Sequence, residues 1–279
     1  MTIRDALLQG QRILEDANVN TARMTAEVLL MHAISHEKQV DRAWLFAHAT
    51  DELAELWWIH YGRYLHERIQ GKPTQYITGR QEFYGREFRV TPDVLIPRPE
   101  TEHLVESAIR RITPGDRVLD VGAGSGAIAV SLALETKARI VATDVSASAL
   151  LKARENAKLL GADVHFLQAD LTSPFANHSF QVIVSNPPYV ATRDRDRLQP
   201  EVRDYEPDLA LFAGPEGLDI FHRISRCAGR VLASRGWLML EIGAGQLDEV
   251  LDIFGRWPCE EVIRDLAGIP RVLAFQSPY

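Results

Sequence analysis

Apolar residues in the first part of the chain have the spacing of amphipathic helices. They recur at intervals of three and four residues over 3–17 and again over 22–33, which places them on one face of a helix. A longer helix with similar spacing is expected to start at Thr50 or Asp51, because either side chain can cap its first turn. The pattern predicts a small helical domain over residues 1–72.

The periodicity changes twice after this helical region. Residues 73–100 contain short runs that end at glycine or proline, which suit a hairpin-like linker. From residue 116 onward strand-like runs alternate with helix-like runs, as in a mainly parallel sheet joined by crossover helices. The last strand-like run, residues 271–276, is expected at an edge of the sheet. Residues 101–279 are therefore predicted to form an α/β domain.

Composition and charge narrow the class of protein. With 46% hydrophobic and 25% charged residues, the chain has the usual composition of a folded globular protein. Its formal net charge of −7 disfavours a surface devoted to nucleic acid, which normally carries a basic excess. Cys227 and Cys259 fit no metal-ligand or disulfide spacing, and no apolar run is long enough to span a bilayer. A cytoplasmic protein with reduced thiols and no metal is expected.

A glycine-rich turn between a strand and a helix is the first candidate binding feature. The run DVGAGSG, residues 120–126, lies where a parallel sheet brings its backbone close to a ligand. Gly122, Gly124 and Gly126 remove the side chains that would block this approach. The next strand ends at Asp144, whose carboxylate can accept hydrogen bonds from both hydroxyls of a ribose. Together these residues favour a nucleoside site.

Other interpretations of these strand ends stay open at this point. Tight strand-to-helix turns require glycine for conformational reasons alone. A nicotinamide dinucleotide also suits a glycine turn and an acidic residue, although the second half of the chain lacks a second nucleotide-binding repeat. Asp170 and Leu171 end the third strand, where they offer adenine one acceptor and one apolar surface. A solvated strand end is the alternative for this pair.

A strand followed by two prolines is the second candidate feature. The run QVIVSNPPY places Asn186, Pro187, Pro188 and Tyr189 on the rim where open parallel sheets bind ligands. Two prolines cannot continue a central strand, so they turn the chain rigidly. The side-chain carbonyl of Asn186 and the backbone carbonyl of Pro187 can then converge. The alternative is a turn that only ends the strand, with Asn186 as a local turn former.

Two convergent acceptors suit the two hydrogens of a planar NH2 group. Holding both hydrogens orients the nitrogen for in-line attack on a sulfonium methyl group, and Tyr189 can stack on the flat face of the same group. Because the nitrogen lone pair is delocalised, catalysis is expected to rest on orientation and on the two carbonyls instead of a strong general base. The predicted catalytic residues are Asn186, Pro187 and Tyr189, and the predicted reaction is methyl transfer to an amide or amino nitrogen.

The two motifs, together with Asp144 and the run LIPRPETE at 95–102, resemble the HemK/PrmC family of glutamine methyltransferases over nearly the whole chain. The resemblance implies a helical N-terminal domain, a β-hairpin linker over residues 73–100 and a Rossmann-like class I methyltransferase domain that uses S-adenosylmethionine. It assigns substrate contacts to Asn186, Pro187, Pro188 and Tyr189. It assigns cofactor contacts to Gly122, Ala123, Gly124, Ser125, Gly126, Asp144, Leu171 and Asn186, and the position of Asp170 adds this residue to them.

The family reaction is methylation of the glutamine amide in the Gly-Gly-Gln segment of class-1 release factors, with S-adenosylhomocysteine as the second product. The resemblance therefore implies that the helical domain docks a protein substrate, and we expect a cytoplasmic monomer that binds neither nucleic acid nor membrane. One alternative is methylation of an exocyclic amino group of adenine or guanine in nucleic acid, because the same clamp holds any planar NH2 group. A regulatory nucleoside-binding module is the other.

Several charged residues keep two interpretations. Arg98 and Glu102 either border the site or form a structural ion pair between prolines. Glu241 ends a strand beside glycine, where it either faces the cleft or, as the favoured reading, is solvated. The charged run at 193–198 is interpreted as a solvated loop or helix start.

Overall fold

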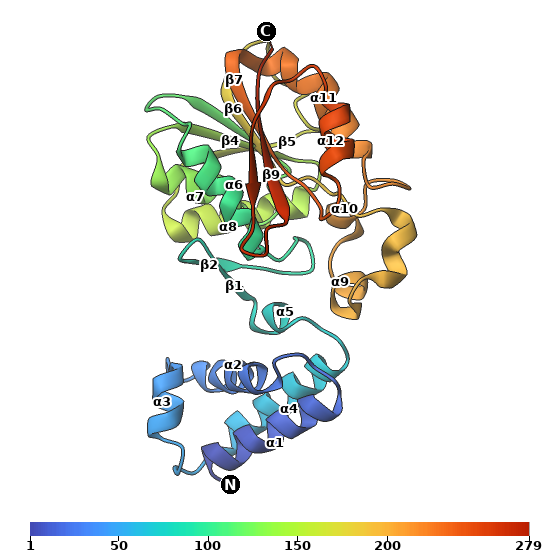
Figure 1. The fold of residues 1–279 in the computed structure, drawn as a ribbon. Helices are drawn as coiled ribbons and strands as arrows, with labels where there is room; N and C mark the ends of the chain where they lie inside the picture. The colour runs from blue at the N-terminus through green and yellow to red at the C-terminus, as the bar shows by residue number, and fades with distance from the viewer. Residues whose placement is uncertain (279) are drawn as a thin grey trace. The chain divides into compact units, whose positions relative to one another are not determined.

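The computed structural model describes residues 1–278, which divide into two compact units (Figure 1). The smaller unit comprises Met1–Gly79 together with Gln199–Tyr205. The larger unit comprises Arg80–Leu198 and the described residues from Glu206 onward. The roles expected of residues 1–72, 73–100 and 101–279 as docking domain, linker and catalytic domain stay predictions.

The smaller unit is built from helices around one apolar core. Its helices are α1 (Ile3–Asp16), α2 (Ala22–Ser35), α3 (Arg42–Ala47), α4 (Glu55–Ile69), α5 (Thr74–Thr78) and α9 (Pro200–Tyr205). The apolar stripes of α1, α2 and α4 meet in this core, as their spacing predicts. Segment α9 joins this unit although it lies far along the chain, because Arg68 forms an ion pair with Glu201 and the Tyr205 hydroxyl donates to the Gln70 carbonyl at 2.9 Å.

The expected start of the third long helix is wrong. Helix α4 begins at Glu55, and neither Thr50 nor Asp51 caps it. The preceding backbone is already used by the N-terminus, because Ile3 donates to the Asp51 carbonyl at 3.0 Å and Leu53 donates to the Met1 carbonyl at 2.9 Å. Backbone groups that are hydrogen-bonded to the N-terminal segment are not available for the first turn of a helix.

A short hairpin opens the larger unit. Strands β1 (Arg80–Phe83) and β2 (Arg86–Arg89) pair antiparallel. Tyr84 and Gly85 connect them with φ angles of +51° and +69°, the left-handed conformation that a tight hairpin turn requires. The hairpin lies inside the stretch of short runs at 73–100.

The larger unit is organised by a seven-stranded sheet with the order β5-β4-β3-β6-β7-β9-β8. The strands are β3 (Arg117–Val121), β4 (Arg139–Asp144), β5 (Val164–Gln168), β6 (Phe180–Ser185), β7 (Leu232–Glu241), β8 (Cys259–Arg264) and β9 (Pro270–Gln276). Strands β3 to β7 pair in parallel, whereas β9 runs antiparallel to β7 and β8. The expectation that 271–276 forms an edge is wrong, because β8 pairs with its outer side.

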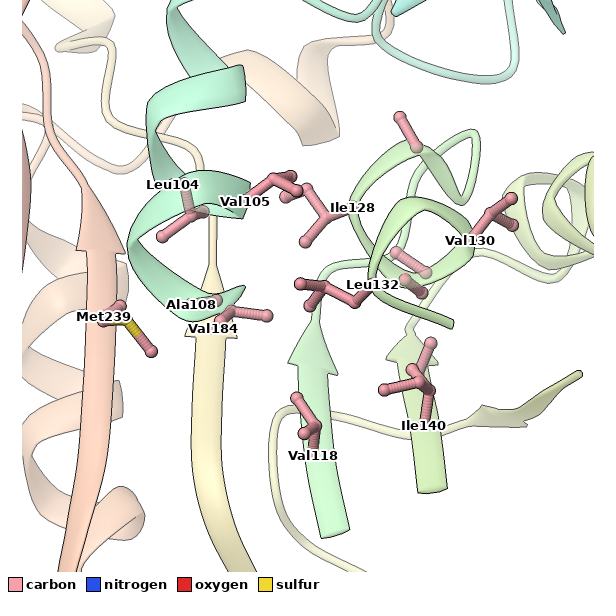
Figure 2. Close-up of a cluster of buried hydrophobic side chains, with 14 of the residues drawn as sticks. Leu104, Val105, Ala108, Val118, Ile128, Val130, Leu132, Ile140, Val184 and Met239 are labelled. Atoms are coloured by element: carbon pink, nitrogen blue, oxygen red, sulfur yellow. The ribbon is translucent and has the colours of Figure 1, made fainter. Parts of the chain in front are cut away.

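Helices cover both faces of this sheet. The covering helices are α6 (Glu102–Ile109), α7 (Ala127–Glu135), α8 (Ala147–Leu160), α11 (Asp219–Val231) and α12 (Leu247–Ile253). The larger unit also contains the short helix α10 (Asp208–Leu211) and the 3-10 helices η1 (Pro99–Thr101) and η2 (Thr192–Arg197). Helices α6, α7 and α8 share one core cluster, and α11 and α12 share the other. Side chains of adjacent strand residues enter opposite clusters, as with Val118 and Leu119. Figure 2 shows α6 and α7 packing over the strands.

A contact between Gly10 and the buried ring of Tyr61 gives a test of the helical core. A Cβ atom at Gly10 would lie 1.9 Å from the Tyr61 hydroxyl oxygen, so Gly10→Ala is expected to destabilise the smaller unit by about 2 kcal/mol. Gly62→Ala is the matched control, because its Cβ would meet nothing within 4 Å and alanine stabilises a helix by about 0.5–1 kcal/mol over glycine. Amide hydrogen exchange in α1 and α4 measures both changes. Equal effects of the two substitutions would contradict this packing.

Candidate active site

An open cleft lies at the carboxyl ends of the parallel strands. Its space is about 1210 Å³ when the solvent at its mouth is included. Four strand ends contribute residues 121–125, 143–146, 169–171 and 185–188. The remaining lining consists of residues 93–95, 97, 98, 101, 127, 128, 149, 207, 209, 210, 220 and 223. The cleft therefore brings together segments that are widely separated in sequence.

The three glycines of the turn are required for two different reasons. Gly122 and Gly124 have positive φ angles of +86° and +53°, and a Cβ atom at either would meet no protein atom within 4 Å. Gly126 also has positive φ, but its Cβ would lie 3.1 Å from the Cβ of Ala153. The first two glycines therefore leave backbone open to the cleft, and Gly126 allows α7 and α8 to approach each other.

Asp144 is held rigidly at the end of β4. One carboxylate oxygen accepts from the Gly124 N–H at 2.9 Å, and the other accepts from the Ser146 N–H at 2.8 Å. Each oxygen retains a further lone pair. The carboxylate can therefore accept a second hydrogen bond at each oxygen without changing its position.

Just after the end of β5, the carboxylate of Asp170 is already paired with an arginine. Asp170 lies in the cleft wall, where both of its oxygens accept from Arg223 of α11 at 2.7 and 2.6 Å. Leu171 has a φ of +50°, and its carbonyl accepts from the Thr143 hydroxyl at 3.2 Å. The contacts predicted for adenine at Asp170 and Leu171 stay predictions. No sequence pattern indicates the role of Arg223, because its partner Asp170 lies on a different element.

A buried asparagine fixes the back of the glycine turn. The side chain of Asn156 on α8 is fully buried and donates to the carbonyls of Ser125 at 2.8 Å and Arg89 at 3.0 Å. Its own carbonyl accepts from the Arg89 N–H at 2.8 Å. Asn156 thus joins the hairpin strand β2 to the turn. The one sequence signal is its place on the apolar face of α8, next to Ala153 and Ala157.

The Asn-Pro-Pro-Tyr run divides between the cleft and the core. Asn186, Pro187 and Pro188 line the cleft. Tyr189 does not line it, because its ring packs against the core cluster of α11 and α12 and approaches Gly243. The stacking role of Tyr189 stays a prediction. The amide nitrogen of Asn186 donates to the Thr101 hydroxyl at 3.1 Å, a contact that the sequence pattern missed because Thr101 lies on another segment.

Arg98 and Glu102 do not pair with each other. Arg98 lines the cleft and forms an ion pair with the buried carboxylate of Glu206, which also accepts from the Ile96 N–H at 3.3 Å. Glu102 instead accepts from the Tyr84 N–H at 2.9 Å in the hairpin turn. Arg98 therefore both borders the cleft and braces it, whereas Glu102 braces the hairpin.

Glu241 is buried at the end of β7, so the favoured expectation of a solvated strand end is wrong. Its pKa is raised to about 7, mainly because burial disfavours the charged form and also because of the charge of Glu100. Hydrogen bonding with Thr101 and Asn186 and the charge of Arg271 act in the opposite direction. Glu241 does not itself line the cleft.

Asp120 is a second buried carboxyl beneath the glycine turn. It is fully buried, and neither oxygen has a hydrogen-bond partner among the described residues. Its pKa is raised to about 7, mainly by burial and also by the charge of Asp144, whereas the N–H of Ala129 in the first turn of α7 acts to lower it. Loss of water around an ionised carboxylate is thus only partly offset by the N-terminus of α7.

The raised pKa of Asp120 predicts a pH-dependent stability. The native chain holds this proton more tightly than the unfolded chain, whose Asp pKa is 3.8. The resulting stability is fully present below the unfolded pKa and is lost as pH rises through about 7. The unfolding free energy of Asp120→Asn minus that of the native chain should therefore increase by roughly 2–3 kcal/mol between about pH 5 and about pH 8. Urea titrations measure the shift, and a constant difference would contradict it.

Among the described residues, no group of three or more His, Cys, Asp and Glu side chains is arranged to hold a metal ion. None of the described helices is both long and apolar enough to cross a membrane.

Comparison with known proteins assigns both units to domain families. The model of the PrmC N-terminal domain matches residues 5–79, and the model of the methyltransferase small domain matches residues 100–200. A solved methyltransferase from Pyrococcus furiosus superposes with a TM-score of 0.55 at 16% sequence identity, over 71% of this chain and 91% of that chain. This likeness confirms the expected Rossmann-like methyltransferase fold of the larger unit.

Two relatives match nearly from end to end. A release factor glutamine methyltransferase of Koribacter versatilis is 42% identical and covers 100% of this chain and 99% of its own length. A protein of the same name from Geobacter sulfurreducens is 41% identical and covers 98% of this chain and 95% of its own length. With similarity at this level over both units, the chain belongs to the family of release factor glutamine methyltransferases.

Proposed function

We propose that this enzyme transfers the methyl group of S-adenosylmethionine to the side-chain amide nitrogen of the glutamine in the Gly-Gly-Gln segment of a class-1 peptide chain release factor. The observation that carries the proposal is that Asp144 and the Asn186–Pro188 rim line the same cleft. The names of the full-length relatives supply the release factor as substrate.

The residues around the glycine turn fit S-adenosylmethionine. Asp144 has free lone pairs on two fixed oxygens for the ribose hydroxyls. The open space over Gly122 and Gly124 lets a ligand approach the backbone directly. Asp170 and Leu171, in the cleft wall, take the adenine in this proposal, and Ala123 and Ser125 complete the turn. When bound, this cofactor supplies an electrophilic methyl group on a sulfonium.

The rim of the cleft binds the substrate amide. The side-chain carbonyl of Asn186 and the backbone carbonyl of Pro187 accept the two amide hydrogens, and Pro188 limits movement of the flat group. These contacts hold the nitrogen in one plane, with its lone pair directed at the methyl group. With the cofactor bound, the new bond between the nitrogen and the methyl carbon would replace the bond between that carbon and the sulfonium sulfur, and S-adenosylhomocysteine would leave. The two carbonyls would stabilise the positive charge that develops on the nitrogen before it loses one proton to solvent.

The substrate is proposed to be a protein. The formal net charge of −7 supports a protein substrate over nucleic acid, whose phosphates would require a basic surface. The helical unit docks the release factor in this proposal, and the enzyme acts as a cytoplasmic monomer. None of these steps requires nucleic acid or a membrane.

A transfer assay with labelled S-adenosylmethionine tests the proposed function. Purified enzyme should label purified release factor, and mass spectrometry should place the added methyl on the glutamine of the Gly-Gly-Gln segment. Release factor with this glutamine changed to alanine should accept no label. Label in nucleic acid with none in release factor would overturn the proposal.

Two substitutions should separate substrate chemistry from cofactor binding. Asn186→Ala removes one acceptor for the amide and is expected to lower kcat by about 100-fold. Asp144→Ala removes a charged acceptor and is expected to weaken cofactor affinity by about tenfold or more. Asn177→Ala, an exposed asparagine outside the cleft lining, is the matched control and should change neither value. Calorimetry measures affinity and steady-state transfer measures kcat; the same loss in all three variants would contradict the assignment.

A further inference from the structure

Three side chains, two that line the cleft and one behind them, form a connected polar group. Thr101 ends η1, Asn186 follows β6 and Glu241 ends β7. Thr101 and Glu241 are buried, with 4% and 2% of their surface exposed. The amide nitrogen of Asn186 donates to the Thr101 hydroxyl at 3.1 Å, and both side chains act as hydrogen-bond partners of the Glu241 carboxyl. Asn186 and Thr101 line the cleft, whereas Glu241 lies behind them.

The chemistry of these groups determines which way the Asn186 amide faces. An ionised carboxylate only accepts hydrogen bonds, so its neighbours must turn donors toward it. The hydroxyl of Thr101 accepts from Asn186 and has one hydrogen of its own to donate to Glu241. The NH2 group of Asn186 therefore belongs on the buried side, and its Oδ1 belongs on the cleft side. The opposite orientation would place Oδ1 against the carboxylate.

We infer that Thr101 and Glu241 are positioning residues that hold the Asn186 amide with Oδ1 facing the cleft, where it accepts a hydrogen from the substrate amide. This inference rests on the proposed function. It assigns a role to the buried carboxyl, whose Oε2 has no hydrogen-bond partner among the described residues. It also explains why an NH2 group is preferred, because the fixed amide presents an acceptor and not a donor.

Charged and titratable groups on three neighbouring segments act on Glu241. Glu100 of η1 repels its negative charge, and Arg271 of β9 attracts it while remaining paired with Asp265 at 2.8 Å. The Tyr189 hydroxyl stays neutral, because burial raises its pKa. With the pKa of Glu241 near 7, the ionised form that fixes Asn186 increases as pH rises through neutrality. Protonated Glu241 can donate to Oδ1 and allows the reversed orientation.

Substitutions at Thr101 give the direct test. Thr101→Val keeps the shape of the side chain but removes the hydroxyl, so kcat for methyl transfer to release factor is expected to fall about tenfold or more. The KM for S-adenosylmethionine should stay within about twofold. Thr101→Ser restores the hydroxyl and should recover kcat to within about threefold. Ser131→Ala, which removes a buried hydroxyl of α7 without a partner, is the control and should leave kcat unchanged.

The pH profile gives a readout that a merely structural role would not change. For the native enzyme, kcat should rise from about pH 6 to about pH 8 as Glu241 ionises. Glu241→Gln cannot ionise, so this rise should become smaller. Asp120 titrates in the same range, so the native profile alone does not isolate Glu241. The effect of Glu241 is the difference between the pH profiles of kcat for the native enzyme and for Glu241→Gln. An unchanged rise in Glu241→Gln would contradict the inference.

The outcomes separate this inference from the proposed function. Native enzyme that labels no release factor would overturn the proposed function. Native enzyme that is active, with Thr101→Val retaining the kcat of Ser131→Ala, would overturn the positioning role alone. Loss of kcat in both Thr101→Val and Thr101→Ser, with unchanged thermal unfolding, would also overturn it, because the hydroxyl would then not be the feature required.

Discussion

The parallel pairing of β3 with both β4 and β6 is the constraint on which the site depends. Asp120 lies opposite Ala142 on one side and Val184 on the other, so the three strands end at nearly the same level. The glycine turn, Asp144 and Asn186 each follow one of these ends. Because hydrogen bonds along the whole strand fix the register, the cleft inherits its geometry from the sheet and not from its loops. This explains how residues so distant in sequence line one cleft.

Two carboxyl groups are buried at or near the ends of β3 and β7, which lowers the stability of the fold. Asp120 and Glu241 are both buried, and burial raises the pKa of each to about 7. A core selected only for stability would place apolar residues there. Glu241 adjoins the side chains that orient Asn186, and Asp120 lies under the turn that holds Asp144. Perturbed carboxyl groups of this kind are typical of functional sites, where placement of charge outweighs stability.

The sequence predicted the parts of the site that are encoded locally. Gly122, Gly124, Asp144 and the Asn186–Pro188 run lie at strand ends, and strand ends follow from the alternation of apolar runs. The side chains that support them were missed, because the partners of Thr101, Asn156 and Glu206 lie on other segments. The same reason explains two errors in the fold: β9 is covered by β8, and the start of α4 is delayed by backbone pairing of residues 51 and 53 with the N-terminus.

The chain enters the helical unit a second time at Gln199–Tyr205, after all four strand ends that line the cleft. Neither unit is therefore a continuous piece of sequence. A chain cut at Gly79 would lack α9 and leave the guanidinium of Arg68 without Glu201. During synthesis on the ribosome, the helical unit likewise lacks α9 until most of the methyltransferase domain has been made. Exchange of helical units between relatives would need three junctions in place of one, at 79/80, 198/199 and 205/206.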